Sequence, residues 1–240
     1  MSKDCLNVLE NHVSIRKFVA ESVKDEDLQR IAEVANRAPT AWNLQPVLIT
    51  IVRRDELKEE ISEALGNQPH ISQAPAIAVI SVDLAKAAAA AKEVMGEALK
   101  LGLGLFVEAL ISAALTGAWF EIAAETLGYG VTNVAIYSDP CKVKSILGMN
   151  KGIIPVLGII LGKPAERPSK RPRAPPQYMW GIEEVPPLSG RKEALLRNIG
   201  NDTSLIKMLF GSGGIYESVT RNIEKCLRDE GILPYSATPT

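Results

Sequence analysis

One long apolar segment constrains the fold more than any other part of this sequence. In "EALKLGLGLFVEALISAALTGAWFEIAAETLG" (residues 97–128), only three residues after Lys100 are charged, and all three are glutamates. A helix that is apolar on nearly every side has to be buried all round, inside a domain or between two subunits. Its longest apolar run is well short of the roughly 20 residues that cross a bilayer. We therefore expect a core helix over about residues 103–127.

Hydrophobic periodicity predicts an amphipathic helix earlier in the chain. Leu28, Ile31, Ala32 and Ala35 lie at i, i+3, i+4 and i+7, and Pro39 stops the pattern. A further helix is expected in the alanine-rich stretch 85–93, whose residues are strong helix formers.

Three short β-branched runs predict strands, and they cover residues 47–54, 76–83 and 152–162. These runs are apolar throughout, which is typical of strands covered on both faces. Pro155 in the third run predicts a strand start or a sheet edge, because proline cannot donate to the ladder.

The composition of the sequence changes after Gly162. Residues 163–188 carry seven of the fifteen prolines, each of which fixes its φ angle and lacks an N–H donor. We expect this stretch to be an extended arm that crosses a surface. Two amphipathic helices follow it, at residues 190–199 and 216–232, and Gly231 is placed to end the second.

Composition and charge exclude several classes of protein. The chain is 46% hydrophobic and 23% charged, with a net charge of −1, so no overall field attracts nucleic acid or an anionic membrane. Cys5, Cys141 and Cys226 lie far apart, without a CxxC pair or a nearby histidine, which predicts reduced thiols, no metal site and a cytoplasmic location. The N-terminus has no apolar leader segment.

Familiar catalytic motifs are missing from the sequence. It contains no GxGxxG fingerprint, no GxxxxGK[ST] loop and no GxSxG elbow. With only His12 and His70 in the chain, a Ser or Cys triad has few possible bases, so hydrolase chemistry is disfavoured.

Five segments nevertheless form a recognisable series. They are "HVSIRKF" (12–18), "APTAWNLQP" (38–46), "GNQPHISQAP" (66–75), "ETLGYGVTNVAIY" (125–137) and "LGKPAERPSKRPR" (161–173). In this order and spacing, over residues 4 to about 176, they resemble the FMN-dependent nitroreductase family. The similarity is greatest to its NADPH-linked flavin reductases and major oxygen-insensitive nitroreductases.

The resemblance implies a fold and an assembly. The expected fold class is α+β, with a mixed central β-sheet flanked by helices, in a homodimer whose subunits entwine. The long apolar helix would lie in the shared core, with a flavin at each end of the interface. Residues 1–176 would form the FMN-binding core, and the arm and helices of residues 177–240 would wrap the partner subunit.

The resemblance also implies a site for the phosphate of FMN. A phosphate dianion needs charge-assisted donors, which His12, Ser14 and Arg16 can supply from one turn of chain. Arg171 and Arg173, in the proline-rich arm, would bind the same phosphate. Taken alone, residues 12–17 are more typical of a basic cluster at a helix end than of a phosphate site. The second cluster at residues 171–173, together with the segments between, reverses that preference.

Other segments would contact the flavin ring. The matching residues are Thr40, Ala41 and Asn43 at the subunit interface, Gln68, and the backbone at Val134 and Ala135, which would face flavin N5. Trp42 is equally compatible with plain core packing, and Gln68 with a turn before Pro69. Arg16 would stabilise charge near flavin N1 and the C2 carbonyl. No side chain is expected to act as acid or base, because the chemistry belongs to the cofactor.

Three departures from the family pattern stand out. Val13 replaces the usual arginine, which removes one cation from the phosphate or ribityl region. Ala135 and Ile136 replace the usual glycine pair near N5. The arginine-rich loop that recognises NADPH has no counterpart in residues 200–216, so the resemblance does not decide between NADH and NADPH.

The implied activity is ping-pong transfer of hydride from NAD(P)H through flavin N5 to a nitroaromatic, a quinone or free flavin. Two alternatives remain open. One is a flavin-dependent relative that reduces enones, removes halogens or destroys flavin. The other is a flavin carrier or sensor without enzymatic activity.

Overall fold

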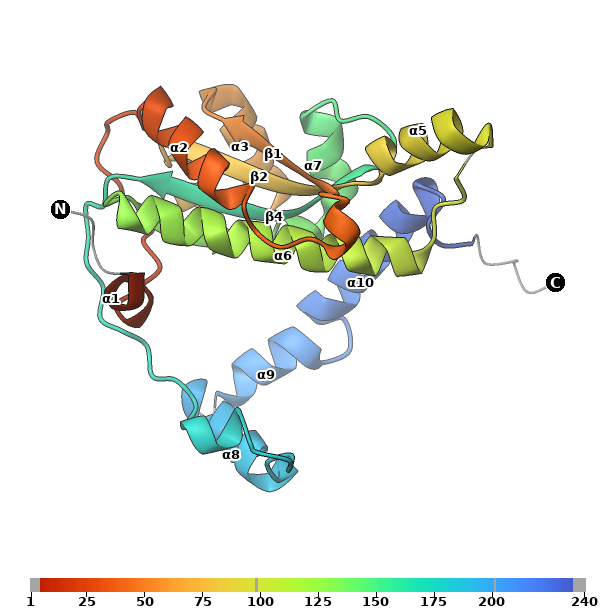
Figure 1. Ribbon diagram of the computed structural model, residues 1–240. Coiled ribbons are helices and arrows are strands. Elements are labelled where there is room, and N and C mark those ends of the chain that lie inside the picture. The colour runs from red at the N-terminus through yellow and green to blue at the C-terminus, as the bar shows by residue number, and fades with distance from the viewer. Residues whose placement is uncertain (1–4, 98, 201, 235–240) are drawn as a thin grey trace. The chain divides into compact units, whose positions relative to one another are not determined.

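Four strands form the sheet on which the fold is built (Figure 1). The structure is a computed structural model that describes residues 5–97, 99–200 and 202–234. The strands are β1 (Val47–Val52), β2 (Ala76–Asp83), β3 (Gly130–Val134) and β4 (Ile153–Gly162), in the order β1-β2-β4-β3. Ile49 pairs with Ile80 between β1 and β2, and Val131 pairs with Leu161 between β3 and β4.

Ten α-helices and three 3-10 turns are found in the described residues. The helices are α1 (Cys5–Glu10), α2 (Asp25–Ala35), α3 (Asp55–Ala64), α4 (Pro69–Ser72), α5 (Leu84–Met95), α6 (Leu103–Thr126), α7 (Pro140–Ile146), α8 (Leu188–Asn198), α9 (Thr203–Phe210) and α10 (Ile215–Asp229). The 3-10 turns are η1 (Ala41–Asn43), η2 (Ile136–Ser138) and η3 (Pro176–Tyr178). The helices predicted at residues 25–39, 85–93 and 103–127 are therefore confirmed as α2, α5 and α6.

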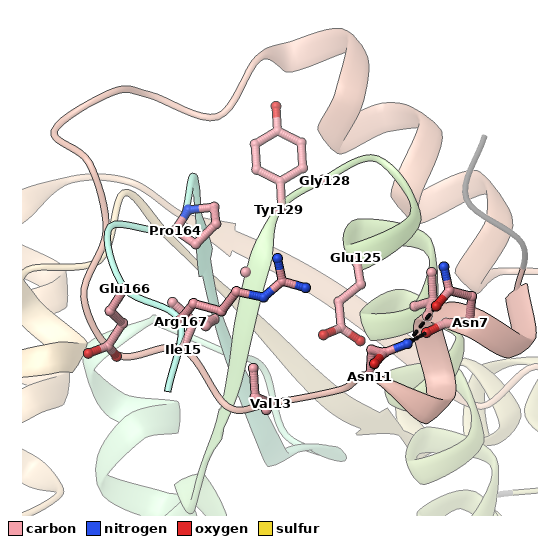
Figure 2. Close-up of a pocket in the computed structure, with 12 residues that line it drawn as sticks. Asn7, Asn11, Val13, Ile15, Glu125, Gly128, Tyr129, Pro164, Glu166 and Arg167 are labelled. Carbon is pink, nitrogen blue, oxygen red and sulfur yellow. Dashed lines mark hydrogen bonds between the residues drawn. The ribbon is translucent and has the colours of Figure 1, made fainter. Parts of the chain in front are cut away.

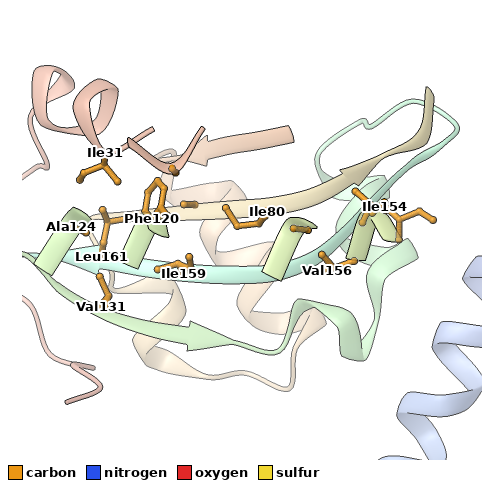
Figure 3. Close-up of a cluster of buried hydrophobic side chains, with 14 of the residues drawn as sticks. Ile31, Ile80, Phe120, Ala124, Val131, Ile154, Val156, Ile159 and Leu161 are labelled. Atoms are coloured by element: carbon orange, nitrogen blue, oxygen red, sulfur yellow. The ribbon is translucent and has the colours of Figure 1, made fainter. Parts of the chain in front are cut away.

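Both faces of the sheet are covered, as the apolar strands predict. Successive residues of β2 alternate between two core clusters, because strand side chains point to opposite faces. Ala78 and Ile80 pack with α2 and α6 in the larger cluster, which Figure 3 shows. Ile77 and Val79 pack in the second cluster, with residues of α3, α4 and α7.

Helix α6 lies close against the sheet. A Cβ atom on Gly117 would lie 2.6 Å from Leu157 Cδ2 of β4, so a larger residue here would require the Leu157 side chain to move. By length and composition α6 is able to cross a membrane, and 39% of its most apolar window is buried in the fold. Because Phe106, Phe120 and the small residues between them pack on the sheet, α6 is a core helix, as predicted.

Two expectations about the sheet were wrong in part. The fold is α+β as predicted, but every strand pairing in the described residues is antiparallel, whereas a mixed sheet was expected. Strand β3 was not predicted, because it is short and begins at Gly130. Pro155 lies near the start of β4, in the part of the strand that pairs with β2. The pairing of β4 with β3 begins only at Gly158, so the missing N–H of Pro155 removes no hydrogen bond to β3.

The chain divides into two compact units, which are residues 1–168 with 221–240, and residues 169–220. The first unit contains the sheet and both core clusters. The second contains the arm, which forms only the short turn η3, together with α8, α9 and the start of α10. The predicted wrapping of a partner subunit by residues 177–240 stays a prediction.

The end of α10 is fixed to the core by covalent and ionic contacts. Cys141 of α7 forms a disulfide with Cys226 of α10, which corrects the expectation of reduced thiols. The two residues are 85 positions apart, so sequence spacing gave no sign of the contact. Nearby, Lys144 Nζ lies 2.6 Å from Glu230 Oε1, with only 12% and 7% of the two side chains exposed. Glu230 Oε2 also accepts a 2.6 Å hydrogen bond from the Gly152 N–H.

We expect the disulfide to stabilise the fold. The variant Cys226→Ser should lower the free energy of unfolding by about 2–4 kcal/mol, because a cross-link over a long loop restricts the unfolded chain. Calorimetry under non-reducing conditions measures this, and Cys5→Ser, which changes an exposed free cysteine, is the matched control. Alkylation of three thiols rather than one in the denatured, unreduced protein would contradict the cross-link.

Candidate functional site

The segment of residues 12–18 lies between β3 and the chain that follows β4. The Ile15 N–H donates to Val131 O at 2.9 Å, and Phe18 forms an isolated bridge with Pro164. Gly130 is required here, because a Cβ atom at that position would lie 2.7 Å from Ile15 Cγ1. The segment predicted to bind the phosphate is thus attached to the sheet at its middle and at its end.

His12 contacts an acidic residue of α6. Its Nδ1 lies 3.0 Å from Glu125 Oε1, and the two side chains are 31% and 15% exposed. Since Glu125 engages Nδ1, only Nε2 of His12 is left for a ligand. Sequence reasoning did not predict this contact, although Glu125 belongs to one of the five segments that carried the resemblance.

A second glutamate of α6 lies beside this pair. Burial raises the pKa of Glu121, and repulsion from Glu125 acts in the same direction, while His12 and a hydrogen bond with Asn133 lower it. The Oε1 atom of Glu121 is buried and has no hydrogen-bond partner within the described chain. Glu121 and Glu125 therefore make one side of the site acidic, which the number of charged residues in the sequence did not indicate.

Arg16 lies close enough to His70 of α4 to act on its charge. The pKa of His70 is lowered by burial and, second, by the positive charge of Arg16. Gln68, which immediately precedes α4, donates from Nε2 to Leu65 O at 2.9 Å. This contact stabilises the turn, which is the alternative role considered for Gln68. His70 was not among the predicted site residues, and its position two residues after Gln68 was the only signal.

The loop with Thr40, Ala41 and Asn43 adopts an unusual conformation. Trp42, Asn43 and Gln45 have φ angles of 52°, 55° and 48°, in the left-handed region that non-glycine residues rarely adopt. The Gln45 N–H donates to Thr40 Oγ1 at 3.2 Å, and Gln45 Nε2 donates to Asn43 Oδ1 at 2.9 Å. Trp42 is 90% exposed, so it is not a core residue in this chain.

This loop and the phosphate segment lie along different parts of α6. Thr40 lines a small cavity of about 60 Å³ with Thr116 of α6, whereas His12 contacts Glu125. Thr116 and Glu125 are nine residues apart, which is about 13 Å along a helix. Within one chain, Thr40, Ala41 and Asn43 are therefore not brought to the His12 segment.

Val134 and Ala135 lie where β3 ends. Val134 is buried and pairs with Gly158 of β4, and the Ser138 N–H donates to Ala135 O at 2.9 Å to close the turn η2. Arg171 and Arg173 belong to the second unit, where both are exposed. Their convergence with Arg16 on one anion stays a prediction.

A cavity of about 360 Å³ opens beside the phosphate segment (Figure 2). It is lined by Asn7, Val8, Asn11, Val13, Ile15, Glu125, Gly128, Tyr129, Gly130, Pro164, Glu166 and Arg167. Figure 2 shows Arg167 reaching across it, with Val13 below. Val13, which replaces the arginine of the family pattern, thus faces open space.

The sequence of this chain is similar to that of known proteins. The model of the Nitroreductase family matches residues 9–163, which span the sheet and the segments around His12, Gln68 and Val134. The chain belongs to the nitroreductase family. Among its relatives, the Bacillus subtilis protein named FMN reductase [NAD(P)H] is 31% identical over 175 residues, covering 72% of this chain and 70% of the relative. A Thermus thermophilus protein named NADH dehydrogenase is 34% identical, covering 66% of this chain and 86% of the relative.

Solved structures of nitroreductases share the fold. Bacillus megaterium NfrA2 has a TM-score of 0.80 at 26% identity, covering 92% of this chain and 96% of its own. The NADPH:FMN oxidoreductase of Vibrio harveyi, solved with NAD+, has a TM-score of 0.78 at 20% identity and covers 96% and 99%, which supports the fold alone. This nitroreductase has no group of three His, Cys, Asp or Glu side chains placed for a metal among its described residues.

The positive charge of Arg16 predicts how His70 titrates. Arg16→Ala should raise the pKa of His70 toward the ordinary histidine value of about 6.5, because the repelling cation is removed. The pKa should stay below that value, since burial is the larger cause. Arg16→Lys keeps the charge and is the control. NMR titration of the imidazole resonances measures this, with His12→Gln for assignment, and an identical His70 titration in Arg16→Ala would contradict the electrostatic effect of Arg16.

Proposed function

We propose that this nitroreductase binds FMN and catalyses transfer of reducing equivalents from NAD(P)H to a nitroaromatic, a quinone or free flavin. The observation that carries the proposal is the family match over residues 9–163, together with relatives that are named FMN reductases. When bound, FMN supplies the redox chemistry by taking up hydride at N5 and passing two electrons to the acceptor. The protein has to hold the ring, neutralise its charge and admit the two substrates.

The donors in the first unit fit the phosphate of FMN. Within the described residues, the Ser14 hydroxyl and the Arg16 guanidinium have no hydrogen-bond or ion-pair partner, so both are available to an anion. Charge-assisted hydrogen bonds to phosphate are the strong ones. In its imidazolium form, with Nδ1 donating to Glu125, His12 would add a donor from Nε2. Arg171 and Arg173 would add two cations from the arm. Val13 contributes none, so retention of the phosphate depends on these residues.

The ring would lie toward the end of β3. There the backbone at Val134 and Ala135 would face N5, and Gln68 would contribute from the turn before α4. The charge of Arg16 acts on His70 at the start of α4, and this charge is placed to stabilise a negative ring edge near N1 and the C2 carbonyl.

We also propose that the active form is a homodimer. On the face of α6 away from the sheet, large apolar side chains are exposed, namely Leu103, Val107, Leu110, Ile111, Leu115 and Trp119. A stripe of this kind normally marks an interface. Pairing two copies of α6 would also let Thr40, Ala41 and Asn43 of one subunit reach the flavin of the other.

The expected location is the cytoplasm, where reduced nicotinamides are available. Disulfides are uncommon there. In the Cys141–Cys226 bond, Cys226 is fully buried and Cys141 is partly buried, which restricts the access of soluble reductants to the bond.

The first test of the proposal is cofactor binding. The purified protein should be yellow, with about one non-covalent FMN per subunit. Arg173→Ala should weaken FMN binding by about 1.5–3 kcal/mol, which is typical of a lost charged hydrogen bond. Arg197→Ala removes an exposed arginine of α8 that pairs with Glu193, and is the matched control. Absence of the visible flavin band after reconstitution would refute the proposal, and unchanged affinity in Arg173→Ala would remove Arg173 from the site.

The second test concerns the order of the two substrates. If NAD(P)H and the acceptor occupy the same face of the flavin in turn, double-reciprocal plots at several acceptor concentrations should be parallel. Each substrate should also inhibit competitively against the other at high concentration. No GxGxxG segment is present to hold a dinucleotide elsewhere. Intersecting lines would mean a ternary complex and a separate nicotinamide pocket.

A further inference from the structure

Glu166 occupies an unusual position beside the phosphate segment. The chain after β4 runs next to residues 17–19, where the Val19 N–H donates to Lys163 O and the Ala165 N–H donates to Lys17 O, both at 2.9 Å. This pairing brings the Glu166 carboxylate to the backbone of the segment. Its Oε1 accepts hydrogen bonds from the Arg16 N–H at 2.8 Å and the Lys17 N–H at 3.2 Å. Figure 2 shows Glu166 and Arg167, neighbours in sequence, pointing in different directions.

Two successive backbone N–H groups are a common ligand for phosphate. In this chain, Glu166 already engages the N–H groups of Arg16 and Lys17. A phosphate at this segment would therefore have to be bound by side chains, chiefly those of Ser14 and Arg16. The direction of the Arg16 side chain then matters more than it would if the backbone held the anion, and that direction depends on how the Arg16 backbone is fixed.

Other contacts hold the segment without Glu166. Ile15 is bonded to Val131, Phe18 bridges Pro164, and Val19 is bonded to Lys163. Between these points, Glu166 provides the contacts to the N–H groups of Arg16 and Lys17. Its removal should therefore leave the fold intact and allow local movement at Arg16.

We propose that Glu166 is a positioning residue of the flavin site, which orients the Arg16 guanidinium toward the cofactor by holding the Arg16 and Lys17 amides. The inference rests on the proposed function, because it takes FMN as the ligand of Arg16. Groups fixed before the ligand arrives bind it more tightly, because less conformational entropy is lost on binding.

A double-mutant cycle tests whether Glu166 acts through Arg16. Glu166→Ala should weaken FMN binding by about tenfold, as expected when a pre-positioned charged contact becomes mobile. In an Arg16→Ala background the same change should cost about twofold or less, because coupled residues are not additive. Glu166→Gln should restore most of the affinity, since its amide oxygen still accepts both hydrogen bonds. Glu21→Ala is the matched control, because Glu21 pairs with the Lys163 side chain and not with the segment backbone.

A second measurement needs no cofactor. If Glu166 orients Arg16, then Glu166→Ala should change the NMR titration of His70 in the same direction as Arg16→Ala does, and Glu166→Gln should not. An equal loss of FMN affinity in both backgrounds would overturn the inference, as would tighter binding in Glu166→Ala. If the wild-type protein bound no FMN, the proposed function would fail. An unchanged His70 titration in Glu166→Ala would overturn the positioning role by itself.

Discussion

The close packing of α6 on the sheet is the constraint on which the rest of the structure depends. At Gly117 the helix lies so close to β4 that a Cβ atom would require the Leu157 side chain to move, and the packed face of α6 continues along the sheet through Phe106 and Phe120. The C-terminal part of α6 then brings Glu121 and Glu125 to His12, while its middle meets the loop at Thr40. The outer face of the same helix remains apolar and exposed. One helix therefore organises the core, one wall of the site and the proposed subunit interface.

Much of the fold could be predicted from the sequence because its signals are local. The apolar stripe of Leu28, Ile31 and Ala35 predicted the helix α2, and the apolar run of residues 76–83 coincides with the strand β2. Contacts between distant residues gave no local signal. The Cys141–Cys226 bond and the Lys144–Glu230 pair join elements that only the fold brings together. Strand direction was also not readable, because apolar strands covered on both faces occur in parallel and antiparallel sheets alike.

The candidate site shows the same division. His12, Ser14 and Arg16 could be proposed because they follow one another in a short segment. Glu125, Glu166 and His70 reach that segment from other elements, so their roles appear only in three dimensions. The segment is consequently a basic stretch among carboxylates that are themselves occupied, Glu125 by His12 and Glu166 by two backbone N–H groups. This arrangement leaves the Arg16 charge without an ionic partner among the described residues.

The central claim is that this nitroreductase passes electrons through bound FMN rather than merely carrying the flavin. Anaerobic mixing of the FMN-loaded protein with NADH and, separately, with NADPH tests it most directly, with the visible flavin absorbance followed in a stopped-flow instrument. We predict rapid bleaching by at least one nicotinamide and recovery of the band when a quinone or nitroaromatic is added. A flavin band that neither nicotinamide bleaches would contradict electron transfer through FMN and favour a flavin carrier.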